Sequence, residues 1–173
     1  MAATMPSMGS SVQNRQATMK SFACDSPLDH WLKRPVPCWE HFDHGADIGV
    51  RGVGATREAA FEQIALALTG VITDPAGVRP ELSVAVTCEA SADDLLVVDW
   101  LNAIVYEMAT RRVVFGKFQV HLDGTRLTAI AWGERVDRAR HEPAVEVKGA
   151  TYTALRFGRR DDGAFVAECV VDV

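Results

Sequence analysis

Two stretches of the chain carry apolar residues at the three- and four-residue steps of an amphipathic helix. The first spans about 57–70 and follows Thr56, whose hydroxyl is a good N-cap. The second spans about 91–109. There we expect Ser91 to cap the helix, with Asp94 completing a pair that resembles a capping box. Each helix has one apolar stripe, which predicts that it covers a sheet.

The other apolar residues follow the two-residue alternation of strands or form short apolar runs. Strand-like segments occur at 47–53 and 82–88. The dipeptide Asp123-Gly124 is a strong hairpin signal within 118–131, and a second hairpin is expected across 151–173. The pattern predicts an α+β fold of two layers, with a mainly antiparallel sheet and two helices packed on one face.

The segment before this pattern differs in composition. Residues 1–20 are rich in Ala, Ser, Thr, Met and Gln without apolar periodicity, so we expect residues 1–37 to form a disordered tail. Pro35 and Pro37 mark the entry to the folded part, which we place at 38–173. That length, in a chain with 48% hydrophobic residues, fits one domain.

The charge of the chain bears on its partners. A formal net charge of −5 and a pI of about 5.5 give little non-specific attraction to phosphates. We therefore expect RNA to be reached only indirectly, through a partner protein. The sequence has no run of 18 apolar residues and no secretory signal, which predicts a cytoplasmic protein without a membrane span.

Motifs for nucleophilic catalysis and nucleotide binding are missing from the sequence. It contains no G-x-S-x-G, no P-loop and no G-x-G-x-x-G after a strand. It also contains no C-x-x-C pair, and we expect Cys88 and Cys169 to be small core residues. His141 is assigned to a charged loop.

The densest polar cluster lies at 41–47 and includes Asp43, His44 and Asp47. Carboxylates suit hard cations such as calcium, magnesium or manganese, and the imidazoles extend the choice to zinc. The alternative is a solvated loop without a ligand.

A second candidate group lies at the end of the chain. Asp172 stands in an apolar run, so its carboxylate must be exposed, paired or bound to a cation. Val173 adds the terminal carboxylate as a second oxygen donor, although a frayed end is the alternative. Lys148 could contact a phosphate or an acidic partner, but an isolated lysine is also commonly just solvated.

Four segments, in order, resemble the signatures of the archease family. Residues 43–49 resemble D-H-T-A-D-I-G, and 95–102 resemble the helix L-L-x-x-x-W-L-N. Residues 146–152 resemble V-K-A-x-T-Y, and 170–173 resemble the terminal V-x-D-[VI]. The resemblance covers nearly everything after Cys38.

The resemblance implies a compact α+β fold and a divalent metal ion, calcium first, held by Asp47, Asp172 and Val173. It also implies that His44, Asp43 and Lys148 support the site or contact a partner. Archeases assist a tRNA-splicing RNA ligase that joins 3′-phosphate or 2′,3′-cyclic phosphate ends. They promote guanylylation of the ligase by GTP and allow multiple turnover, without being enzymes themselves.

The chain departs from the family pattern at three positions. Gly45 replaces the usual Thr, Ala103 stands where Glu is common, and Gly149 replaces the usual Ala. Two other functions remain open at this point. One is a stand-alone metal-dependent phosphoester hydrolase in which His44 acts as base. The other is a chaperone-like binding module whose metal only stabilises the fold.

Overall fold

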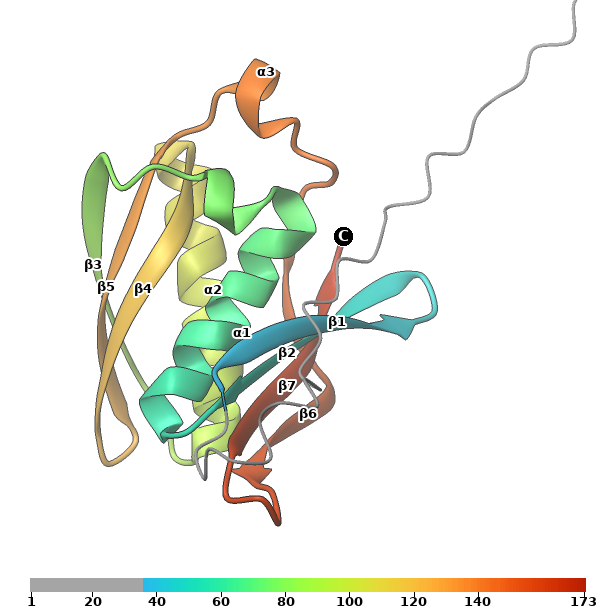
Figure 1. Ribbon diagram of the computed structural model, residues 1–173, viewed down its shortest axis with the longest axis vertical. Coiled ribbons are helices and arrows are strands. Elements are labelled where there is room, and N and C mark those ends of the chain that lie inside the picture. The colour runs from blue at the N-terminus through green and yellow to red at the C-terminus, as the bar shows by residue number, and fades with distance from the viewer. Residues whose placement is uncertain (1–35) are drawn as a thin grey trace, which may run out of the picture.

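Two antiparallel sheets lie on either side of two long helices, as Figure 1 shows for residues 36–173, which the computed structural model describes. In chain order the elements are β1 (Cys38–His44), β2 (Asp47–Gly54), α1 (Arg57–Ile72), the 3-10 helix η2 (Pro75–Gly77), β3 (Leu82–Glu89), α2 (Asp93–Arg111), β4 (Val113–Asp123), β5 (Arg126–Arg135), α3 (Arg138–His141), β6 (Gly149–Arg159) and β7 (Phe165–Asp172). One sheet has the order β1-β2-β7-β6 and the other β3-β5-β4.

The expected tail, residues 1–37, falls outside the described residues except for its last two positions. Its disorder and the domain boundary at residue 38 therefore stay predictions.

The predicted α+β class, the antiparallel pairing and the two main helices are confirmed. The two-layer arrangement is corrected, because the strands divide into two sheets with the helices between them (Figure 1). At about 100° per residue, Leu96 and Val98 point to nearly opposite sides of α2, yet both are buried. Each helix buries a band wider than the ~100° stripe of a helix that rests on one sheet. Accordingly, α2 contacts both β6 and β3, and α1 contacts both β2 and β4.

The core is centred on Trp100, a fully buried side chain of α2. Its indole Nε1 donates a hydrogen bond to the Phe61 carbonyl of α1 at 3.0 Å, and its ring meets Phe118 of β4 edge-on at 5.9 Å. One side chain thus joins both helices to the second sheet.

The two helices begin in different ways. Thr56 caps α1 as predicted, because its hydroxyl accepts a hydrogen bond from the Ala59 N–H at 3.1 Å. The predicted Ser91 cap is wrong, since Ala92 holds the N-cap position of α2 and makes no side-chain bond. An ion pair from Asp93 to Arg57 ties the start of α2 to α1 instead. No helix within residues 36–173 is long and apolar enough to cross a membrane.

Both predicted hairpins are present, as β4–β5 and β6–β7, and the strands predicted at 47–53 and 82–88 correspond to β2 and β3. The sequence pattern missed β1, because the first strand that it predicts begins at Asp47. In the fold, β1 pairs with β2 along its whole length, from Cys38 opposite Val53 to His44 opposite Asp47.

Candidate functional site

The polar cluster at 41–47 lies on the β1–β2 hairpin. Gly45 in its turn has a φ of +68°, a backbone conformation that favours glycine. Because successive residues of a strand point to opposite faces of the sheet, the members of this cluster do not all lie on one face. His41 lies on the face that meets α1, and His44 lies next to the turn, opposite Asp47.

His41 has a structural environment. Its Nε2 lies 2.7 Å from the Ala67 carbonyl of α1, and its ring packs against Trp39. Burial lowers the pKa of His41, and the hydrogen bond to Ala67 only partly opposes this effect. His41 is therefore a neutral link between β1 and α1.

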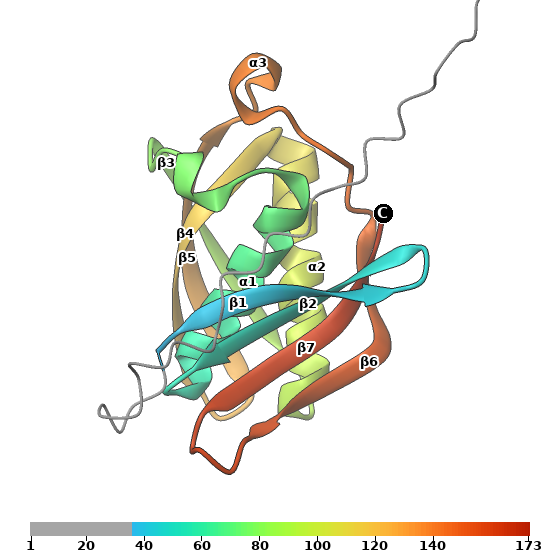
Figure 2. The same cartoon turned by 45° about the vertical axis from the view of Figure 1, so that its right-hand side comes forward.

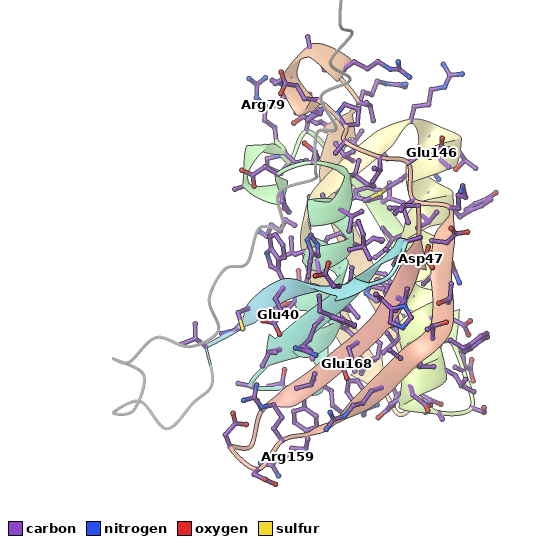
Figure 3. All side chains as sticks on the ribbon, turned by 90° about the vertical axis from the view of Figure 1, so that its right-hand side faces the viewer. Glu40, Asp47, Arg79, Glu146, Arg159 and Glu168 are labelled. Atoms are coloured by element: carbon purple, nitrogen blue, oxygen red, sulfur yellow. The ribbon has the colours of Figure 1, made fainter. Side chains whose placement is uncertain are left out.

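Asp47 and Asp172 lie at the ends of neighbouring antiparallel strands. The register of β2 with β7 ends with Ile48 opposite Val171, and continuing it by one position sets Asp47 opposite Asp172. Side chains directly opposite in such a pair have Cβ atoms about 4.5–5.5 Å apart and share one face of the sheet. The fold thus places the two residues from the separate sequence clusters at the same end of one sheet, on neighbouring strands. Figure 3 shows Asp47 at the end of the sheet away from Glu40 and Glu168.

Lys148 completes this edge. Its N–H donates to the Asp172 carbonyl at 2.9 Å, and its Nζ donates to the main-chain oxygen of Val173 at 3.0 Å. The same Nζ lies 3.9 Å from the Asp172 carboxylate. Both side chains are more than half exposed, so this ion pair adds little to stability. We call Asp47, Asp172, Val173 and Lys148 the carboxylate edge.

The carboxylate edge differs from the ion-pair network further along the same sheet. There Arg51 binds Glu40 and, at 2.5 Å, Glu168, so both carboxylates are already neutralised. The Asp47 carboxylate, by contrast, has no hydrogen bond or ion pair with any of residues 36–173. Within the described part of the chain, Asp47 and Asp43 of the same hairpin are therefore carboxylates without a hydrogen bond or ion pair. Asp47 is the one that lies on β2, the strand beside β7.

The donors of the carboxylate edge are two carboxylates and main-chain oxygen, a set that suits a hard divalent cation. Within residues 36–173 no group of three or more His, Cys, Asp and Glu side chains is placed to hold a metal ion. Asp43 and His44 are exposed near the hairpin turn and do not complete such a group. The fit to a metal therefore depends on the main-chain oxygens of Val173 as well as on the two aspartates.

A cleft of about 960 Å³ opens beside the carboxylate edge. Its walls are the β1–β2 hairpin, the end of α1, and the connection from β5 to β6, which Figure 2 shows descending from α3 toward the end of β7. Asp43 and Asp47 line one wall, and Arg140 and His141 line the other. The cleft makes Asp47 accessible from solvent.

A buried polar cluster holds the β5–β6 connection in place. Glu134 of β5 binds Arg140, accepts a hydrogen bond from the Arg79 N–H at 2.6 Å, and lies 3.4 Å from His141 Nε2. The hydrogen bond from Arg140 is the main reason that the pKa of Glu134 is lowered to about 2. Thr73, at the end of α1, donates to the His141 carbonyl at 2.6 Å.

Sequence reasoning missed this cluster and assigned His141 to a charged loop. His141 is in fact buried, and its Nδ1 accepts a hydrogen bond from the Asp137 N–H at 2.9 Å. The only signal was Asp137 ahead of a short polar run, which is an N-cap pattern for α3.

The two described free thiols are not poised for nucleophilic chemistry. Burial raises the pKa of Cys88 to about 11 and that of Cys169 to about 12, so both stay protonated at neutral pH. Cys169 is a fully buried core residue, as predicted, and Cys88 packs against the core while partly exposed.

Residues 39–173 match the Archease protein family. The chain is 37% identical over 139 residues to "Protein archease" of Pyrococcus furiosus and 39% identical over 139 residues to that of Thermococcus gammatolerans. Each alignment covers 78% of this chain and 98% of the relative. The fold is similar to the solution structure of Methanobacterium thermoautotrophicum protein 1598, with a TM-score of 0.69, 29% identity, and coverage of 78% of this chain and 98% of that one.

Proposed function

The chain belongs to the archease family, and on this premise we propose that it is a metal-binding accessory protein that activates a tRNA-splicing RNA ligase. The ligase joins 3′-phosphate or 2′,3′-cyclic phosphate RNA ends and becomes guanylylated from GTP. The accessory protein promotes that guanylylation and allows multiple turnover.

One observation supports the proposal: β2 and β7, which carry Asp47 and Asp172 at their ends, are neighbouring strands, and continuing their register by one position sets the two residues opposite each other. With the main-chain oxygens of Val173 they would hold a divalent ion. Calcium is the first candidate because the family resemblance implies it, and hard oxygen donors suit it. Magnesium and manganese accept the same donors, whereas zinc would need the exposed His44 to join them.

The bound ion would supply positive charge for phosphate oxygens at the ligase active site. The residues of this chain hold and present that charge. Asp47 is reached through the cleft, and Lys148 lies more than half exposed beside Asp172, so both can face a docked partner. The ligase would supply the nucleophile. The raised pKa values of Cys88 and Cys169 are consistent with this, because both thiols stay protonated at neutral pH.

The charge of this chain supports contact with RNA through the ligase rather than directly. A net charge of −5 gives no broad attraction for the phosphate backbone, which usually dominates nucleic-acid binding.

The proposal is tested by measuring guanylylation of a cognate ligase with GTP and calcium, with and without this protein. We expect stimulation by the wild-type protein and loss of at least about tenfold in stimulation by Asp47→Asn. Asp123→Asn is the matched control. It removes an exposed carboxylate from the β4–β5 hairpin of the other sheet, away from the carboxylate edge, and should stimulate like the wild type.

Two results would count against the proposal. No stimulation of the ligase by the wild-type protein would remove the activator role. Turnover of phosphoester substrates by the purified protein alone, abolished by Asp47→Asn, would favour the hydrolase alternative instead.

A further inference from the structure

The side chain of Asn102 joins α2 to the first residues of β6. Its Oδ1 accepts a hydrogen bond from the Ala150 N–H at 2.8 Å, and its Nδ2 donates to the Ala150 carbonyl at 3.3 Å. One amide thus binds both main-chain groups of Ala150. The fit is close, because a Cβ added at Gly149 would lie 3.0 Å from the Asn102 Oδ1.

This part of β6 has few other attachments to its sheet. It pairs with β7 through Gly149, Ala150 and Thr151, after which the register is irregular until Arg156. Within the irregular stretch Ala154 has a φ of +50°, a left-handed conformation that interrupts a strand. The start of β6 is therefore a short segment, separated from the rest of its strand.

The other end of the Asn102 link is fixed. Trp100 and Leu101, the two preceding residues of α2, are fully buried between the sheets, while Asn102 is exposed. The start of β6 is short, and Asn102 attaches it to α2, whose neighbouring residues are packed in the core. The position of this segment therefore follows the position of α2. Lys148 immediately precedes this segment.

We propose that Asn102 is a positioning residue for the carboxylate edge. By fixing Ala150, it sets where the Lys148 ammonium lies relative to Asp172 and Val173. This inference rests on the proposed function, in which that edge holds a cation and faces the ligase. Without the Asn102 amide, the segment from Lys148 to Thr151 keeps its bonds to β7 and to Val173, including the one from the Thr151 hydroxyl to the Val170 carbonyl. It loses its hydrogen bonds to α2 and becomes more mobile.

The experiment compares Asn102→Ala with Thr110→Ala in the full chain. Thr110 is a matched control, because it is also exposed on α2 and its hydroxyl bonds only the Tyr106 carbonyl within that helix. Hydrogen exchange of the Lys148 and Ala150 amides should become about tenfold faster in Asn102→Ala and stay unchanged in Thr110→Ala. The two variants should have similar melting temperatures.

The functional readout separates positioning from general stability. Asn102→Ala should raise about tenfold the protein concentration needed for half-maximal ligase guanylylation, while the maximal rate stays the same. Asn102→Asp keeps the oxygen that accepts from Ala150, so it should recover part of the loss.

Unchanged exchange at Lys148 and Ala150 in Asn102→Ala would overturn the inference. So would faster exchange with an unchanged half-maximal concentration, because the edge would then not depend on Asn102. If the wild-type protein failed to stimulate the ligase, the proposed function would fail, and exchange would still decide whether Asn102 holds the edge.

Discussion

The ammonium nitrogen of Lys148 lies 3.0 Å from the main-chain oxygen of Val173 and donates a hydrogen bond to it. The same nitrogen is 3.9 Å from the Asp172 carboxylate. Lys148 therefore occupies the side of the oxygens that a bound cation would also approach. In the proposed function, lysine and metal compete for these oxygens, and the metal frees Lys148 to face a phosphate.

Replacing Lys148 by methionine separates these two effects. Two unit charges about 4 Å apart interact by ~1 kcal/mol in water, so removing the ammonium should strengthen calcium binding about twofold to fivefold. Ligase stimulation should fall nonetheless, because the exposed positive charge is lost. Calorimetric titration with calcium and the guanylylation assay measure the two quantities.

Lys117→Met is the control for this change, since Lys117 lies over the Trp132 ring on the other sheet. It should alter neither quantity. Weaker calcium binding by Lys148→Met would mean that the lysine holds the oxygens in place and does not compete with the ion.

The opposition of Asp47 and Asp172 predicts a calcium-dependent change in stability. Without metal, like charges directly opposite on paired strands are destabilising, so Asp47→Asn should melt at the same or a slightly higher temperature than the wild type. At calcium one hundredfold above Kd, the wild type gains ~2.7 kcal/mol, which corresponds to roughly 10 °C in melting temperature. Asp47→Asn should lose that gain.

Thermal melts with calcium and with a chelator measure this effect, and Asp123→Asn, at an exposed carboxylate of the other sheet, provides the comparison. An equal calcium response in Asp47→Asn and the wild type would place the ion elsewhere.

The sequence was sufficient for most elements of the fold but not for β1. Both helices, the two hairpins and the strand at Asp47 follow from periodicity and turn residues. In β1 the face toward α1 carries Trp39 and the polar His41, and Glu40 lies between them in sequence, so no continuous apolar face is visible. The strand is recognisable only once Ala67, a distant residue, supplies the partner for His41.

The carboxylate edge, like β1, could not be predicted from local sequence patterns alone. Alternation places Asp172 on a strand, and charge marks Asp47, but no local pattern says that their strands are neighbours. The resemblance to a family supplied that link, and the register of β2 with β7 gives its physical form. The cluster of Glu134 and His141 lay beyond sequence reasoning altogether, because buried polar groups look like solvated ones until their partners are known.

The burial and the hydrogen bond of Trp100 predict that even its replacement by another aromatic residue lowers the free energy of unfolding. Trp100→Phe removes the N–H that donates to the Phe61 carbonyl and leaves a cavity between the sheets. The expected loss is about 2–4 kcal/mol in the free energy of unfolding, measured by urea denaturation. Tyr106→Phe, at an exposed site on the same helix, should change it by less than about 0.5 kcal/mol. A Trp100→Phe loss below about 1 kcal/mol would mean that the core closes around the smaller ring.

The lowered pKa of Glu134 predicts that the folded protein loses stability as the pH falls. The hydrogen bond from Arg140 lowers the pKa of Glu134 from its ordinary 4.5 to about 2 in the folded protein. The unfolded chain therefore binds a proton at higher pH than the folded one. The stabilisation is complete above pH 4.5 and is lost as pH falls from there toward 2.

Glu134→Gln should accordingly melt below the wild type at neutral pH, and the difference should shrink as the pH falls below 4.5. Melting temperatures measured from pH 7 to pH 3 give the comparison. Glu81→Gln is the control, because Glu81 is exposed and lies 3.7 Å from Arg79. It should show no such convergence. A gap between wild type and Glu134→Gln that stays constant with pH would mean that the variant loses packing at β5 and not the charge that anchors the wall of the cleft.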